Sequence, residues 1–258
     1  MSEPRQTFPP AAVVRRPLVF DIETIADLDD VGRAAIAPLA EKREWTVAEY
    51  ASLCPPLARV ASIAWYDIAA GHLVSAFDAT LAPPGAVIPA TFPVPDPVAG
   101  EPDCSARVLG CDGEAEVIAA FGAAVEAHLA QANGWLISFN GRGFDLPVLL
   151  HRGCGLGVER GLPLLLRAMR DHRYSPLCHI DLMDVVTFHG AGSRWPLAAY
   201  AVGYGARSPK TELDGAGVGD AVRAGRIVDV ARYCASDVLA TAFVYRRVER
   251  LIAFGTPR

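Results

Sequence analysis

The sequence lacks an apolar run long enough to span a membrane, and it lacks the positive charge of a protein that coats duplex nucleic acid: the formal net charge is −5. Residues 1–16 contain no apolar signal core. The run behind Arg15 and Arg16 is interrupted at once by Asp21 and Glu23, so it is a poor twin-arginine export signal. We therefore expect a cytoplasmic protein with no membrane partner. The negative charge still allows contact with a few nucleotides at a strand end.

Cysteine is present without a pattern, and lysine is almost absent. The six cysteines form no C-x-x-C pair, which argues against a zinc site or a redox motif, so we expect reduced thiols. Lysine occurs only at positions 42 and 210, and many arginines lie between Arg142 and Arg173. Arginine suits bidentate phosphate contacts, but a genomic bias toward arginine gives the same usage, so both interpretations stay open.

An apolar stretch at 18–25, LVFDIETI, is predicted to form a buried strand that carries two carboxylates. Side chains alternate between the two faces of a strand, so Asp21 and Glu23 share one face while Phe20 and Ile22 share the other. Two like charges on a core strand repel each other unless a multivalent cation lies between them. The stretch thus indicates a metal site. The alternative is that the acids mark where the strand runs out into solvent.

The remaining pattern is typical of an α/β domain. Further strands are predicted at 59–66, 72–81, 134–139 and 178–182, and helices at 30–52, 114–131, 144–152, 195–202 and 228–251. An antiparallel start of three strands, followed by alternating helix and strand, predicts a mixed sheet of about five strands flanked by helices. We expect one domain over 17–251, a flexible tail at 1–16, and a Pro-rich surface insertion without regular structure at about 83–104.

Two later segments also carry acids toward the carboxyl ends of strands, where ligands of such sheets bind. The segment FNGRGFDLP at 139–147 brings Asp145 to the start of a helix; the alternative is that Asp145 is an ordinary N-cap. In the last predicted helix Tyr233 and Asp237 are four residues apart and so lie on the same helix face. The alternative for this pair is exposure to solvent.

These motifs, taken together and in this order, resemble the DEDD superfamily of 3′→5′ exonucleases, which has the ribonuclease H-like fold. The positions that match its four acidic residues are Asp21, Glu23, Asp145 and Asp237. Tyr233 matches the tyrosine subclass, DEDDy. In the histidine subclass the corresponding residue lies one position earlier, where this chain has Arg232.

A narrower resemblance is to prokaryotic proteins related to the exonuclease domain of family B DNA polymerases. It rests on HIDLMD at 179–184, Asp214 with Gly215, and GRI at 225–227. The resemblance covers most of 17–249. The Pro-rich loop and the segment 153–173 depart from the family pattern, which leaves the details of substrate recognition open.

The resemblance implies hydrolysis of phosphodiester bonds assisted by two divalent cations, Mg²⁺ or Mn²⁺, which prefer carboxylate oxygen. It implies that Asp21 bridges both ions, that Glu23 and Asp237 complete the first site, and that Asp145 holds the second. Tyr233 would orient the attacking water, since a phenol with a pKa near 10 is a poor base at neutral pH. The substrate would be the 3′ end of single-stranded DNA or RNA, with DNA favoured, and the products 5′-mononucleotides.

Four further residues are candidate substrate contacts. Asn140, Arg142 and Phe144 could supply a hydrogen bond, a phosphate contact and a stacking surface, although Phe144 suits the core equally well. Asp181 could orient the site or touch substrate, but a capping role fits its position as well. The sequence does not decide between DNA and RNA, because recognition of a 2′-hydroxyl depends on the shape of the pocket.

Two other functional classes compete with the nuclease interpretation. One is a non-catalytic module that retains the exonuclease fold and binds nucleic acid or protein. The other is an aspartyl-phosphate phosphatase, which also begins with an acidic pair on a strand. That chemistry requires a second Asp where Glu23 stands, and it does not account for Tyr233 and Asp237.

Overall fold

The computed structural model describes residues 15–207, 213 and 215–255, with side chains as far as Ile252. The tail predicted at 1–16 therefore lies almost wholly outside the described residues, and Arg16 already belongs to the first strand. Asp214, part of one of the family motifs, also lies outside them. Among the described residues, no helix combines the length and the apolar character needed to cross a membrane.

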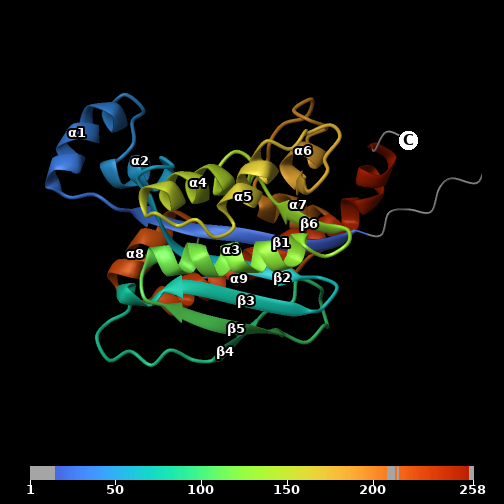
Figure 1. Ribbon diagram of the computed structural model, residues 1–258, viewed down its shortest axis with the longest axis horizontal. Coiled ribbons are helices and arrows are strands. Elements are labelled where there is room, and N and C mark those ends of the chain that lie inside the picture. Colours follow the sequence, from blue (N-terminus) through green and yellow to red (C-terminus); the bar gives the residue numbers. More distant parts are fainter. Residues whose placement is uncertain (1–14, 208–212, 214, 256–258) are drawn as a thin grey trace, which may run out of the picture.

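The described chain forms one mixed sheet covered by helices on both faces (Figure 1). The strands are β1 (Arg16–Ala26), β2 (Ala58–Asp67), β3 (His72–Asp78), β4 (Thr91–Val94), β5 (Cys104–Cys111), β6 (Gly134–Ser138) and β7 (His179–Asp181). Their order across the sheet is β4-β5-β3-β2-β1-β6-β7. Strands β2 and β4 run antiparallel to their neighbours, while β6 is parallel to β1 and to β7.

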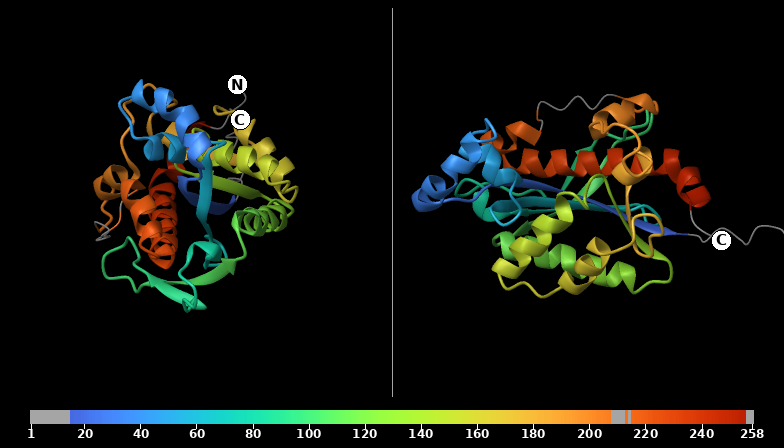
Figure 2. Two further views of the ribbon diagram at one scale, coloured as in Figure 1. Left: turned by 90° about the vertical axis from the view of Figure 1, so that its left-hand side faces the viewer. Right: turned by 90° about the horizontal axis from the view of Figure 1, so that it is seen from above.

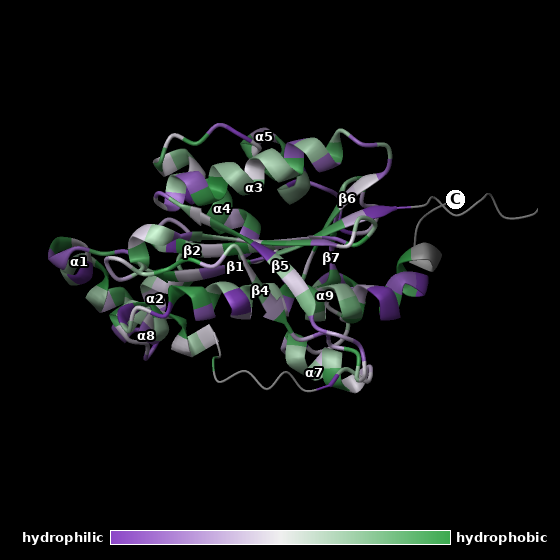
Figure 3. Cartoon of the chain, turned by 90° about the horizontal axis from the view of Figure 1, so that it is seen from below, coloured by the Kyte–Doolittle hydropathy of each residue, from purple (hydrophilic) through white to green (hydrophobic). Residues whose placement is uncertain are grey.

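The helices form one layer on each side of the sheet, as Figures 2 and 3 show. Their bounds are α1 (Asp30–Glu41), α2 (Val47–Leu53), α3 (Glu114–Leu129), α4 (Asp145–Gly155), α5 (Leu162–Met169), α6 (Leu182–Val186), α7 (Leu197–Gly203), α8 (Val218–Arg223) and α9 (Ile227–Gly255), with short 3-10 turns at Ala79–Leu81 and Gly215–Gly217. Helices α3, α4 and α5 share one hydrophobic core with the sheet, and α6 to α9 share the other.

Two parts of the sequence prediction were wrong. The segment predicted as an irregular insertion contains β4, and β5 follows it, so the sheet has seven strands where about five were expected. Pro93 hid β4, yet proline is tolerated there because β4 is an edge strand. The single helix predicted at 30–52 is two helices, α1 and α2, and Thr46 forms a capping box at the start of α2.

Strand β1 separates the two cores as its alternation predicts. Phe20 and Ile22 are buried against the layer of α3 to α5, whereas Val19 belongs to the core on the α9 side. Opposite the second carboxylate, the pairing of β1 with β2 steps by one residue, so that Ala61 becomes a bulge. A bulge increases the local twist of the strands and can redirect neighbouring side chains.

Helix α9 crosses the sheet at close range because its contacting residues are small. Ala231, Cys234 and Ala235 are completely buried on this face. The Ser75 hydroxyl of β3 donates a hydrogen bond to the Ala231 carbonyl at 3.0 Å, and Cys234 Sγ lies 3.4 Å from the carbonyl oxygen of Asp21. The backbone of α9 therefore lies almost directly on the sheet.

This close contact predicts that α9 does not tolerate a larger residue. Ala231→Leu forces extra methylene groups between α9 and β3, and overpacking of this kind costs about 1–3 kcal/mol, or roughly 2–10 °C in Tm for a chain of this size. The control is Ala240→Leu on the same helix, at a partly exposed position. Thermal unfolding of both variants tests the packing; equal Tm values would contradict it.

Candidate active site

Four carboxylates from three separate elements lie close together beside β1. Asp21 and Glu23 come from β1, Asp145 from the start of α4, and Asp237 from α9. Burial, together with the negative charges of Asp145, Glu23 and Asp237, raises the pKa of Asp21 well above its usual value. The pKa of Glu23 is raised by burial and by Asp237 and Asp145. The acids predicted from three distant segments are thus close enough to repel one another.

The first two carboxylates form a tight group with a thiol. One ligand atom from each of Asp21, Glu23 and Cys234 lies within 4.8 Å of the others. Cys234 Sγ is 3.9 Å from Asp21 Oδ2. Cys234 was expected only to be a reduced thiol like the other five cysteines, although its step of three residues from Asp237 in a helix was a signal that both lie near the same face.

Asp145 is held by backbone amides beside β1. It is the first residue of α4, and Phe144 occupies the N-cap position without a side-chain cap, so the N-cap alternative for Asp145 is wrong. Its carboxylate accepts hydrogen bonds from its own N–H and from that of Ile22, which lower the pKa. Burial is the larger effect and raises the pKa to about 7. Much of the metal-free protein is therefore protonated at Asp145 below neutral pH.

Asp237 and Tyr233 interact directly, as their spacing on α9 predicted. The Tyr233 hydroxyl donates a hydrogen bond to the Asp237 carboxylate. Burial raises the pKa of Asp237 to about 6. Burial also raises the pKa of Tyr233, and the charges of Asp237, Glu23 and Asp21 raise it further. Tyr233 is therefore a protonated hydrogen-bond donor beside the carboxylates, and the pair does not simply face solvent.

Asp181 positions the loop that precedes Asp145. Its carboxylate accepts hydrogen bonds from the backbone N–H groups of Asn140 (2.8 Å), Arg142 (2.9 Å) and Met183 (3.0 Å), the last of which caps α6. Asn140 has a positive φ of 64°, which this anchoring stabilises. The described contacts of Asp181 are thus structural, and it is 5% exposed.

A second constraint on the same loop comes from Gly141. A Cβ atom at Gly141 would lie 2.3 Å from Ser138 Oγ at the end of β6. Glycine therefore lets the loop turn back tightly over the strand end, and this turn brings Asp145 to β1. The short connection explains how a residue on α4 reaches the pair on β1.

The predicted substrate contacts are only partly oriented toward the carboxylates. The Arg142 guanidinium donates from Nη1 to the carbonyls of Met169 (3.0 Å) and Asp171 (2.8 Å) and pairs with Asp184, so it is already occupied and is not a free phosphate contact. Phe144 packs against the core of α3 to α5 with part of its surface exposed. Asn140 is also partly exposed.

The donor set suits hard divalent cations. Four carboxylates offer oxygen ligands; burial raises the pKa of each, and the charges of the neighbouring acids raise the pKa values of Asp21 and Glu23 further. A multivalent cation removes this repulsion. The buried thiol of Cys234 is a softer ligand, and burial and the neighbouring acids raise its pKa, which keeps it protonated.

Comparison with known proteins assigns most of the chain after β4 to a family. A family model described as "Predicted 3'-5' exonuclease related to the exonuclease domain of PolB" matches residues 108–254. That range contains Asp145, Tyr233 and Asp237, while Asp21 and Glu23 precede it. No curated protein matches the sequence.

Among solved structures, the family B DNA polymerase from the hyperthermophilic archaeon Pyrobaculum calidifontis is similar to 95% of this chain, with a TM-score of 0.52 and 18% sequence identity. The chain spans 25% of the length of that polymerase, and at this identity the likeness concerns the fold alone. It confirms the predicted fold class, a mixed α/β sheet of the ribonuclease H-like type.

The raised pKa values predict an unusual pH dependence of stability without metal. An Asp side chain has a pKa of about 3.9 when unfolded, against about 7 for Asp145 in the fold. At Asp145 the folded state then binds more protons than the unfolded chain between about pH 4 and pH 7, so the stability that this residue contributes is highest at the acidic end of the range and is lost as the pH rises. Burial lowers the pKa of His179 to about 3, which has the opposite sign, so the effect of Asp145 is read from the difference between two proteins. In EDTA, we expect the Tm of Asp145→Asn minus the Tm of the wild type to increase from pH 4 to pH 7.

The matched control is Asp220→Asn, which changes an exposed carboxylate on α8 and should leave the slope as it is in the wild type. A pH profile of Tm with the same shape in all three proteins would contradict the raised pKa of Asp145.

Proposed function

The chain belongs to the family of predicted 3′-5′ exonucleases related to the exonuclease domain of PolB, and from this premise we propose that it is a DEDDy-type, metal-dependent 3′-5′ exonuclease. It hydrolyses phosphodiester bonds at the 3′ end of single-stranded nucleic acid, DNA being the favoured substrate, and releases 5′-mononucleotides. The observation that carries the proposal is the convergence of Asp21, Glu23, Asp145 and Asp237 beside the Tyr233 hydroxyl.

The carboxylates would hold two divalent cations, Mg²⁺ or Mn²⁺. When bound, these ions supply the positive charge that makes water a nucleophile at neutral pH and stabilises the leaving oxygen. Asp21, whose pKa is raised by the charges of all three other acids, would hold the ions together with Glu23, Asp237 and Asp145. Each acid reaches its place through a rigid element: β1, α4 or α9.

Tyr233 acts as a hydrogen-bond donor and not as a base. Its raised pKa keeps the phenol protonated at any physiological pH, and Asp237 fixes the direction of its hydroxyl. A protonated phenol next to the carboxylates can orient the attacking water through its oxygen. Proton removal must then fall to another group, since the phenolate is not accessible.

The surroundings favour a single strand end over a duplex. The net charge of −5 opposes the many phosphate contacts of a duplex-coating protein. Asn140 and Phe144 remain partly exposed on the loop that carries Asp145, where they can touch the terminal nucleotide. Asp181 fixes this loop through hydrogen bonds to the backbone N–H groups of Asn140 and Arg142, so Asp181 is a positioning residue.

Neutralising the acids should abolish activity. Asp21→Asn and Asp237→Asn each remove a carboxylate ligand, and we expect loss of Mn²⁺-dependent release of mononucleotides from an end-labelled single strand. Tyr233→Phe removes one positioning hydrogen bond to a charged group, which costs roughly 10- to 150-fold in rate. Asp220→Asn serves as the control and should retain wild-type activity.

Circular dichroism and thermal unfolding of each variant exclude loss of the fold as the cause. DNA and RNA oligonucleotides of the same sequence are compared with Mg²⁺ and with Mn²⁺. Purified wild-type protein that releases no mononucleotide from either strand with either metal would refute the proposed activity.

Divalent cations should also stabilise the folded protein. Because the ions bind the converged carboxylates of the native state and not the unfolded chain, millimolar Mn²⁺ should raise Tm at pH 7 by mass action. Adding EDTA should reverse the shift, and Asp237→Asn should reduce it. An identical melting curve with and without Mn²⁺ would mean that the acids do not form a metal site.

A further inference from the structure

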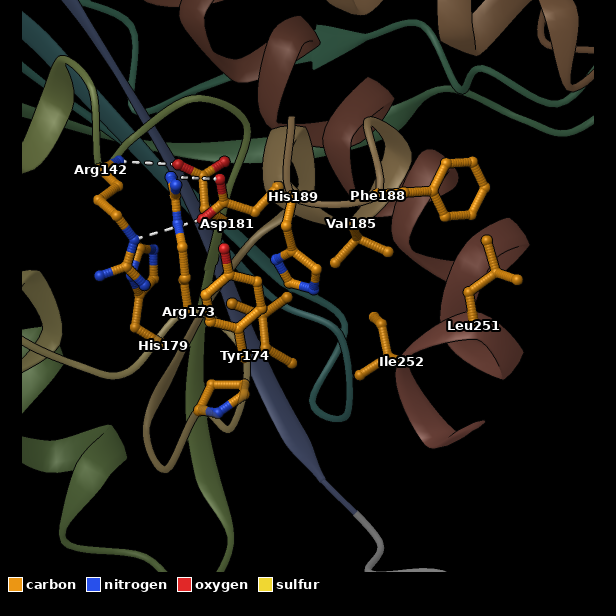
Figure 4. Close-up of a pocket in the computed structure, with 13 residues that line it drawn as sticks. Arg142, Arg173, Tyr174, His179, Asp181, Val185, Phe188, His189, Leu251 and Ile252 are labelled. Carbon is orange, nitrogen blue, oxygen red and sulfur yellow. Dashed lines mark hydrogen bonds and ion pairs between the residues drawn. The ribbon is translucent and has the colours of Figure 1, made fainter. Parts of the chain in front are cut away.

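A cavity lies at the β7 edge of the sheet, apart from the group of four carboxylates. Its volume is about 210 Å³, and its walls come from the loop after α5, from β7 and α6, and from the end of α9. Figure 4 shows Arg142, Arg173 and His179 on one side of it and Phe188, Leu251 and Ile252 on the other. Apolar side chains supply most of the cavity surface and a few polar groups lie among them, as in pockets that bind small organic ligands.

The polar side of the cavity contains buried atoms without a hydrogen-bond partner. Asp184 Oδ2, Arg142 Nε and His189 Nδ1 are all in this state. Arg142 Nε and Asp184 Oδ2 lie 3.5 Å apart, which is an ion pair but too long for a good hydrogen bond. Asp184 is 6% exposed. Buried polar atoms in native proteins are rarely left unsatisfied, and a ligand with both donors and acceptors would satisfy this group once the enclosing side chains make room for it.

Aromatic side chains stand at the mouth of the cavity. Tyr174 is 55% exposed and Phe188 65% exposed. The rings of Tyr174 and His189 are 4.6 Å apart between centroids, tilted by 50°. Phe188 and His189 both have positive φ angles, 50° and 59°, which are uncommon for bulky residues. Backbone conformations of this kind are often found at binding sites. Here they place the rings of Phe188 and His189 beside the cavity.

The charges of the cavity distinguish between classes of ligand. Arg142 is already engaged with two carbonyls and Arg173 with Asp184 at 2.7 Å, and the Asp184 charge opposes an anion, so a phosphate is disfavoured. The positive charges of Arg142 and Arg173 likewise disfavour a bound metal ion. A planar, uncharged heteroaromatic ring fits the polar and the apolar side chains of the cavity. Its edge can donate a hydrogen bond to Asp184 Oδ2 and accept one from the N–H of His189 or Arg142, and its face can stack on Tyr174.

The cavity is connected to the carboxylates by the loop that carries Asp145. Arg142, which lines the cavity, precedes Asp145 by three residues, and Asp181 lines the cavity while holding this loop by two backbone hydrogen bonds. A strand whose 3′ end lies at Asp21 and Asp145 can therefore run along the loop toward the cavity.

We propose that this cavity binds a nucleobase, through Asp184, Arg142 and His189 at its edge and Tyr174 on its face. The base belongs to the single strand, upstream of the 3′ end that is cut; this assignment to the strand rests on the proposed exonuclease activity, whereas the recognition of a base does not. A free nucleotide presents the same chemistry, and the experiment separates the two sources.

The test uses the full chain in EDTA, where the metal centre cannot contribute. Binding of 5′-fluorescein-labelled single-stranded DNA is measured by anisotropy for the wild type, for Tyr174→Ala, and for Tyr204→Ala as the control, an exposed tyrosine outside the cavity. The same strand carries one abasic position, moved stepwise from the 3′ end. Adenosine, guanosine, cytidine and thymidine 5′-monophosphates are titrated separately.

We expect Tyr174→Ala to weaken strand binding roughly fivefold or more, the lower range for loss of one base–aromatic stack, and Tyr204→Ala to leave it unchanged. One abasic position should weaken wild-type binding similarly and have no effect in Tyr174→Ala, which identifies the bound base. A third outcome is that Tyr174→Ala weakens the binding of mononucleotides but not of the strand. This result supports recognition of a base but assigns the cavity to a free nucleotide.

The proposal is overturned if Tyr174→Ala binds both the strand and the mononucleotides as the wild type does. Failure of the proposed activity is distinct from this result: it would appear as a wild-type protein that hydrolyses neither DNA nor RNA with Mn²⁺, whatever the effect of Tyr174→Ala in EDTA.

Discussion

The structure depends on one unfavourable interaction, the repulsion among four carboxylates that are held together inside the fold. Burial and neighbouring negative charge raise the pKa values of Asp21 and Glu23, so the metal-free site is poised to take up protons or cations. The rest of the fold supplies the energy that keeps the acids together. A cation that relieves the repulsion then acts on a site that is already assembled, so little reorganisation is needed on binding.

Three structural devices bring the acids to one place. The alternation of β1 puts Asp21 and Glu23 on the α9 side, and small residues such as Ala231 and Ala235 let α9 lie close enough for Asp237 to reach them. The loop after β6, anchored by Asp181, turns tightly and delivers Asp145. That same loop carries Arg142 into the neighbouring cavity, so the proposed catalytic and the proposed base-binding groups share one rigid support.

The sequence predicted the parts of this arrangement that follow local rules. Alternation on β1 and the four-residue step from Tyr233 to Asp237 are properties of a strand and a helix, and both hold in the structure. Strand β4 could not be predicted, because its Pro93 contradicts strand propensity and is tolerated only at a sheet edge, which is a property of the whole fold. The direction of Arg142 was likewise set by distant carbonyls, at Met169 and Asp171, that no local pattern reveals.

The central claim is that Asp21, Glu23, Asp145 and Asp237 together form a site for divalent cations. Crystals of the wild-type protein soaked in Mn²⁺ and measured at the manganese absorption edge test it most directly. The account predicts anomalous density for two ions bounded by these four carboxylates, with Asp21 in contact with both. Density elsewhere, or none at all with Asp145 or Asp237 turned away from β1, would contradict it.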